Sequence, residues 1–250
     1  MNVLHIAWRE LRSIFHTPVG WLVLGGYLFV TGVFWVYMVE NYVLQSQDLV
    51  YNPYAASQLT LEDYLLEPFF GNCAVVLLMI LPGVSMRLFS EEFRQHTMEL
   101  LLTSPVSTAE IVLGKFFGAL GFVGVLLLTS LHYPIALLQW GTPEPGVLLG
   151  GYLGLLLMSG ALLAMGMLFS SLTSNQIVAM VLAFAASLSL FVLDWGAESP
   201  DDWNHKLALA PHLSDMLQGA LKVSDIAYFV LFGAFCLFAT HQRLESYRWS

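Results

Sequence analysis

The chain has 250 residues, of which 57% are hydrophobic and only 11% charged, and its formal net charge is −9. Its mean hydropathy is +0.70. About a quarter of the residues in a soluble domain are charged, so the composition excludes that class and indicates an integral membrane protein. The acidic balance also argues against a nucleic-acid partner.

The first residues predict a helix that lies on the membrane surface. Over residues 4–16 apolar side chains recur at helical spacing from Leu4 to Phe15, and Arg9 falls on another face. Amphipathic helices with tryptophan and arginine lie at the lipid headgroups, and Pro18 then turns the chain into the bilayer. The sequence leaves open whether this helix is an elbow that moves with the first span or a passive anchor.

Six apolar stretches approach or exceed the ~20 residues that cross the hydrocarbon layer. They cover residues 19–39, 69–88, 116–138, 147–169, 177–193 and 223–240. We therefore predict an all-α integral membrane protein with six transmembrane helices, forming a single domain over residues 1–250.

The longer connections on one side of these spans predict two ordered external segments. Residues 40–68 are expected to form a loop packed on the outer face, in which Thr60 caps a short helix. Further along, two short helices are expected over residues 205–210 and 213–221, with Pro211 separating them.

Turn residues mark two further features. Tyr133-Pro134 falls inside the third span and predicts a kink. Residues 140–146, WGTPEPG, predict a tight external hairpin.

The basic residues indicate an orientation. Six spans place both termini on one side, and that side holds seven of the nine basic residues: Arg9, Arg12, Arg87, Arg94, Lys115, Arg243 and Arg248. By the positive-inside rule the termini and the loop over residues 87–115 are expected to be cytosolic. Twelve of the eighteen acidic residues fall on the other side, which we expect to be a solvated face rather than a cation site.

The loop over residues 87–115 is the longest charged segment of the chain. Residues 89–102 predict an amphipathic helix that lies against a surface, and Pro105 ends it. Ser107 and Glu110 then fit a capping box, so a second helix is expected to begin there and run into the third span.

Small residues recur at helical spacing in three spans, which allows helices to approach closely in lipid. Glycines do so in the third span, at Gly114, Gly118, Gly121 and Gly124, and in the fourth, at Gly146, Gly150 and Gly154. In the fifth span the row consists of Ala179, Ala183 and Ser187.

Motifs for enzymatic chemistry do not occur in the sequence. It has no H-E-x-x-H, no G-x-S-x-G and no phosphate-binding loop around Gly114-Lys115. Cys73 and Cys236 lack the spacing of a zinc site and are expected to be buried apolar residues. A protein driven by ATP would therefore need a partner that supplies the nucleotide site. Apart from Asp225 no charge lies deep within a span, which disfavours an ion-coupled carrier.

Several stretches resemble the type-2 ABC transporter permeases, the membrane subunits of a class of ABC exporters. MRLFSEE, MELLLTSPVS and EIVLGKF are similar to the cytosolic loop of that family. WRELRSIFHTPVGWLVLGGYLF, LGGYLGLLL and LFSSLTSNQIVA resemble the gliding-motility-associated subgroup. The resemblance covers most of residues 5–190.

The resemblance implies an ATP-driven export permease of the bacterial inner membrane. Cytosolic ATPase subunits would bind ATP and Mg, and a second permease copy and an auxiliary membrane protein would join them. In this family the loop carries a coupling helix that docks on the ATPase, and the corresponding residues are Arg87, Phe89, Glu91, Glu92, Phe93, Met98, Glu99, Leu102 and Pro105. Spans one and five meet their mates in the family dimer, so Ala179, Ala183 and Ser187 are the candidate dimer contact.

Two other functions remain as alternatives. A non-transporting membrane scaffold could recruit a cytosolic partner through the same loop, residues 87–115. An intramembrane enzyme is the weakest hypothesis, because it needs a polar pair within the bilayer that the sequence does not offer.

Overall fold

The computed structural model describes residues 2–51, 60–98, 106–137, 143–197, 199 and 202–248, and the regular elements in these ranges are helical. The long helices are α2 (Pro18–Tyr51), α3 (Glu67–Ser85), α6 (Thr108–Ser130), α8 (Pro145–Leu172), α9 (Gln176–Val192) and α12 (Val223–Arg248). The short ones are α1 (Asn2–His16), η2 (Glu62–Leu66), α4 (Arg87–Arg94), α7 (His132–Leu137), η3 (Leu193–Gly196), α10 (Trp203–Leu207) and α11 (Leu209–Leu217).

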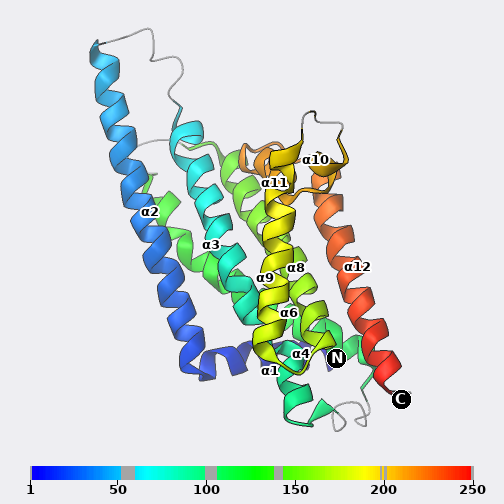
Figure 1. Ribbon diagram of the computed structural model, residues 1–250. Helices are drawn as coiled ribbons and strands as arrows, with labels where there is room; N and C mark the ends of the chain where they lie inside the picture. Colours follow the sequence, from blue (N-terminus) through cyan, green and yellow to red (C-terminus); the bar gives the residue numbers. More distant parts are fainter. Residues whose placement is uncertain are drawn as a thin grey trace.

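Within the described ranges, six helical segments are long and apolar enough to cross a membrane: Pro18–Gln47, Glu62–Arg94, Thr108–Leu137, Pro145–Leu172, Gln176–Gly196 and Val223–Tyr247. Each contains one of the predicted spans within the described part of the chain, so the predicted fold class is confirmed. The long helices stand side by side in Figure 1, and α1 lies across their lower ends.

The bundle has a central group and an outer group of helices. In the apolar stretches of α3 and α8, 61% of the residues are buried, against 22% in α2 and 17% in α9. Aromatic rings join α3 to its neighbours: Trp35 of α2 packs edge-on against Phe69 at 5.0 Å, and Phe70 packs edge-on against Tyr152 of α8 at 5.2 Å. The outer helices therefore keep large apolar faces for lipid or another chain.

The glycine rows pack helices within the subunit. A Cβ on Gly114 would lie 2.6 Å from the side chain of Ile6, and one on Gly118 would lie 2.8 Å from the carbonyl oxygen of Ala7, so α1 rests directly on α6. On α8, a Cβ on Gly150 would lie 2.4 Å from the carbonyl oxygen of Met216 on α11. These contacts are the close approaches that small residues allow.

The predicted external loop over residues 40–68 is wrong in its first part. Helix α2 continues to Tyr51, and its 34 residues make it about 51 Å long, well beyond the hydrocarbon layer. The chain has no glycine or proline between Gly32 and Pro53, so nothing stops the helix where the apolar pattern ends. The predicted cap is present, because the Thr60 hydroxyl accepts a hydrogen bond from the Asp63 amide at 3.1 Å.

The third span is interrupted where Tyr133-Pro134 predicted a kink. Helix α6 ends at Ser130, Leu131 forms a tighter turn, and α7 follows. The Tyr133 hydroxyl donates to the Leu28 carbonyl oxygen at 2.7 Å, which fixes the kinked end on α2. Of the predicted 140–146 hairpin, residues 140–142 lie outside the described part of the chain.

The pair of short helices before the last span is confirmed, with other boundaries. The break is at Ala208, which is extended, whereas Pro211 lies in the first turn of α11, where its missing N–H breaks no helical bond. Several acids of this end have partners: His205 bonds Asp194 and His212 bonds Asp225, each at 2.7 Å. The face is thus less freely solvated than its composition predicts.

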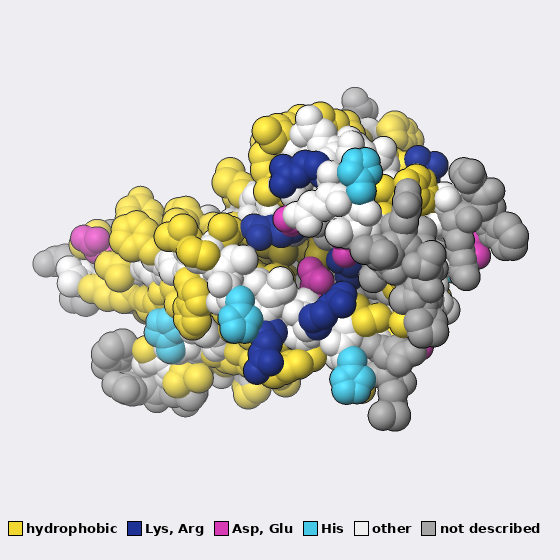
Figure 2. Space-filling view, turned by 90° about the horizontal axis from the view of Figure 1, so that it is seen from below, with side chains coloured by type: hydrophobic (Ala, Val, Ile, Leu, Met, Phe, Trp, Pro, Cys, Tyr) yellow, Lys and Arg dark blue, Asp and Glu magenta, His cyan; other side chains and the backbone are white. Residues whose placement is uncertain are grey.

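Lys222 pairs with Asp215 at the same end of the molecule, and this hydrogen bond raises the pKa of the lysine. The opposite end holds both termini, α1 and α4 (Figure 1). Figure 2 looks onto that end and shows Lys and Arg side chains spread over it. The predicted placement of both termini on one side is therefore confirmed.

Candidate functional site

The predicted coupling helix is shorter than the sequence suggested. Helix α4 ends at Arg94 instead of running to Leu102, and Glu99, Leu102 and Pro105 lie outside the described residues. Met86 joins α4 to α3 with helical backbone angles (φ −54°, ψ −34°). The polar helix therefore continues the second span and is not an independent surface helix.

A left-handed residue ends α4. His96 has φ 56°, its amide donates to the Phe93 carbonyl, and the Thr97 amide donates to the Glu92 carbonyl at 3.1 Å. These two bonds form the Schellman motif that closes many helices. Histidine is among the residues that occupy the left-handed region more often than most, but the sequence has no glycine here to announce the stop.

The junction of α3 and α4 is fixed by a serine from α8. The Ser170 hydroxyl donates to the Met86 carbonyl oxygen at 2.7 Å and accepts from the amides of Phe89 at 3.1 Å and Ser90 at 3.0 Å. It thus inserts into the backbone ladder at the point where the helix turns, a recognised cause of bends. Ser170 and Phe89 are fully buried.

A glycine one turn earlier brings α8 close enough for this contact. A Cβ on Gly166 would lie 2.0 Å from the Ser85 hydroxyl oxygen, so only glycine fits there. Gly166 and Ser170 form a small-xxx-small pair. That spacing is the signal by which the sequence could have identified this contact.

A buried lysine ties α4 to two other helices. Lys115 on α6 is 3% exposed, and its Nζ lies 2.8 Å from Glu92 on α4 and 3.6 Å from Glu10 on α1. The same Nζ lies 5.4 Å from the centre of the Phe89 ring, within the range of a cation–π contact. Glu92 therefore has its partner within this chain.

The other predicted coupling residues divide into packed and open positions. Met98 is buried, and Phe93 packs edge-on against Tyr247 of α12 at 5.2 Å. Glu91 accepts a hydrogen bond from Gln95 in the next turn at 3.1 Å. The open tip of the helix consists of Arg94, Gln95 and His96, which are exposed, and the half-exposed Glu91.

The start of α6 is fixed in the same region. Ser107 and Glu110 form the predicted capping box, with the Glu110 amide donating to the Ser107 hydroxyl at 3.2 Å. The Thr108 hydroxyl donates to Glu245 of α12 at 2.8 Å. Contacts of α4 and α6 with the last helix were not expected, since residues 195–250 carry no resemblance.

The small-residue row of α9 faces inward. Ala179, Ala183 and Ser187 are at most 1% exposed in the single chain, and Ala183 packs beside Gly166 of α8. The row therefore packs within the subunit and does not lie on a face that a second copy could contact. The apolar residues that α9 does expose include Ile177 and Val181.

No group of three or more His, Cys, Asp or Glu side chains that could hold a metal ion occurs among the described residues. The arrangement instead connects one polar helix to several spans. The short polar helix α4 continues one span and is fixed to three further ones.

Six membrane-length helices with an amphipathic helix across one end define a polytopic helical membrane protein. The family model described as ABC-2 family transporter protein matches residues 21–208, three quarters of the chain. The chain therefore belongs to the ABC-2 transporter family and is a membrane permease subunit of an ABC transporter. No curated protein matched the chain.

Proposed function

We propose that this permease works in an ATP-driven exporter of the bacterial inner membrane, with both termini in the cytosol. Separate ATPase subunits bind ATP and Mg and dock on the open tip of α4. The family supports an ATPase partner, and the basic residues at the end with the termini support the orientation.

One observation carries the proposal: α4 is fixed to several spans at once. It continues α3 through Met86, it holds α8 through Ser170, and it holds α6 and α1 through Lys115. A helix that only anchored the protein at the headgroups would need none of these buried polar contacts.

These contacts give a route for motion. When the ATPase pair closes on ATP, it pulls the exposed end of α4 near Gln95. Because α3 and α4 share one continuous backbone, the second span tilts with it. Lys115 and Ser170 are buried and hydrogen-bonded to α4. If α6 or α8 stayed behind, a buried charge or backbone amide would lose its partner, which is costly, so both helices move with α4.

The homodimer in this proposal uses the outer faces of α2 and α9. These two helices have the smallest buried share of the six spans, and they expose large apolar side chains such as Phe29, Val33 and Val181. The resemblance to the gliding-motility-associated subgroup adds a companion membrane protein to the complex. A heterodimer with a related permease would use the same faces.

The test is a reconstituted complex of the permease and its ATPase subunit. We expect ATP turnover that depends on the permease and rises with the transported compound, assayed with lipids, glycans and peptides. The scaffold function would be supported instead if the ATPase bound the permease but its ATP turnover stayed unchanged and the complex transported no compound.

A further inference from the structure

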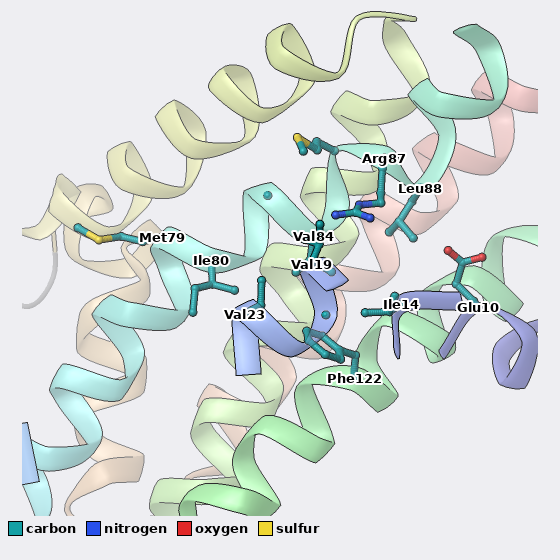
Figure 3. Close-up of a pocket in the computed structure, with 13 residues that line it drawn as sticks. Glu10, Ile14, Val19, Val23, Met79, Ile80, Val84, Arg87, Leu88 and Phe122 are labelled. Atoms are coloured by element: carbon teal, nitrogen blue, oxygen red, sulfur yellow. The ribbon is translucent and has the colours of Figure 1, made fainter. Parts of the chain in front are cut away.

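A cavity of about 270 Å³ lies where α1 turns into α2 and both meet α3 and the start of α4 (Figure 3). Its wall is apolar except for two charged residues, Glu10 on α1 and Arg87 on α4. Figure 3 shows the Arg87 side chain bent over the cavity beside Val84, with Val23 and Ile80 further in. The cavity thus has a polar end and an apolar end.

Arg87 is half-buried and makes no hydrogen bond or ion pair with any residue that the structure describes. A charged group that has lost part of its water without gaining a partner is costly. Arg87 is therefore available to bind an anionic group of a ligand.

The charges around the cavity determine which headgroup fits. Lys115 is already 2.8 Å from Glu92 and reaches Glu10 only at 3.6 Å, so this side carries one excess negative charge. Arg87 carries one unpaired positive charge. A zwitterionic headgroup neutralises both ends, whereas an anionic one leaves the carboxylate excess in place.

The position of the cavity determines where its ligand comes from. Trp8 and Trp21 are exposed around α1, and such residues mark the headgroup level of a bilayer. At the rim, Val19 and Met79 are 43% and 63% exposed, so the cavity opens sideways between α2 and α3. The ligand is therefore an amphiphile of the adjacent leaflet.

We propose that this cavity binds one zwitterionic phospholipid with a primary ammonium, that is, a phosphatidylethanolamine. Its phosphate lies on Arg87, its ammonium near Glu10, and the first methylenes of one acyl chain lie against Val23 and Ile80. The cavity is slightly below the ~300–1,000 Å³ of a site that encloses a whole small molecule. Most of the lipid therefore stays in the bilayer, and the bound headgroup joins α1 to α4.

The test titrates the delipidated full-length protein with dioleoyl phosphatidylethanolamine, phosphatidylcholine and phosphatidylglycerol and measures apparent Kd by native mass spectrometry. We expect phosphatidylethanolamine to bind about tenfold more tightly than the other two, the value of one hydrogen bond to a charged group. Arg87→Gln should weaken it by about the same factor, and Glu10→Gln should remove the preference. Arg9→Gln on α1 and Glu91→Gln on α4, which do not line the cavity, should change neither.

A second pair of variants tests the cavity without changing a charge. Gly83 lines it, and a Cβ there would meet nothing within 4 Å, so Gly83→Leu should fill the cavity and abolish the preference for phosphatidylethanolamine. Gly124 has the same free space outside this cavity, and Gly124→Leu should bind as the wild type does. Thermal unfolding of each variant shows whether it is folded.

Three results would overturn the proposal. One is equal or tighter binding of phosphatidylglycerol, which would mean that the site binds any anionic headgroup and does not recognise the ammonium. Another is unchanged lipid binding in Gly83→Leu, which would place the lipid elsewhere. The third is a fall in the dimer fraction of Arg87→Gln with no change in lipid binding, which would mean that a second copy covers the cavity.

Discussion

The ammonium of Lys115 on α6 lies 2.8 Å from a carboxylate oxygen of Glu92 on α4, and the lysine is only 3% exposed. Such a pair adds little net stability, because both groups lose water when they are buried. The pair makes it costly to separate α4 from α6, because Glu92 or Lys115 would then be a buried charge without a partner. Helix α4 is therefore held to α6 whenever it moves.

We expect Lys115→Met to lower the free energy of unfolding by about 3–5 kcal/mol, because it leaves Glu92 and Glu10 without their cation. Lys115→Met combined with Glu92→Leu should recover part of this loss. Unfolding in mixed detergent micelles measures both, and Arg243→Met provides a control at an exposed arginine of the same end. Additive losses in the double variant would mean that the two residues are not coupled.

Ser170 and its neighbour Ser171 allow a matched comparison. Both are buried, but the Ser171 hydroxyl donates only to Leu168 of its own helix, at 2.7 Å, whereas Ser170 bonds the α3–α4 junction. Ser170→Ala should cost about 1–3 kcal/mol, because it leaves buried backbone groups unpaired, and it should reduce ATPase stimulation. Ser171→Ala should leave stimulation unchanged, and equal effects of the two variants would contradict the role given to Ser170.

The sequence predicts the spans well because membrane length and apolar composition are local properties. The capping box at Ser107 was also predicted, since its two residues lie three positions apart. The end of α4 was not, because a histidine rather than a glycine takes the left-handed position. The extension of α2 to Tyr51 was missed because the end of an apolar pattern is not the end of a helix.

The contacts of the candidate site depend on residues far apart in the chain. No sequence motif links Glu10, Glu92 and Lys115, and only the packing of α1, α4 and α6 brings them together. The small-residue row around Ala183 correctly indicates a close helix contact, but its spacing cannot say which helix is the partner. Enlarging Ala183 would therefore test packing against α8, not the dimer.

Labelling of single cysteines tests the orientation. Cysteines placed at Thr142 and Ser199 should react with an impermeant thiol reagent from outside intact cells, and cysteines at Ser104 and the exposed Gln95 should not. The native Cys73 and Cys236 are free and buried, so their background should be small. Reaction at Ser104 or Gln95 without permeabilisation would reverse the orientation.

The proposed dimer faces can be tested with a bulky residue. Val181 on α9 and Leu231 on α12 are both exposed apolar residues, at 55% and 68%. We expect Val181→Trp to reduce the dimer fraction in detergent, because close helix packing in lipid depends on shape. Leu231→Trp should have no effect, and the reverse pattern would move the interface to α12.

The last prediction separates the two adjacent glutamates of α4. Glu91 lies at the open tip of the helix, whereas Glu92 is paired with Lys115 inside the chain. If the ATPase docks on the tip, Glu91→Ala should release it or uncouple its turnover, at a cost of about 2–5 kcal/mol for a desolvated charge pair across the interface. Glu92→Ala should first lower the stability of the permease itself.

Co-purification of the ATPase and stimulated ATP hydrolysis are measured on each variant, together with the unfolding of the permease alone. Glu40→Ala, an exposed acid at the opposite end of α2, should leave all three unchanged. Glu91→Ala with normal binding and turnover would exclude this carboxylate from the interface. Docking would then depend on Arg94, Gln95 and His96, because these are the other open side chains at the described tip of the helix.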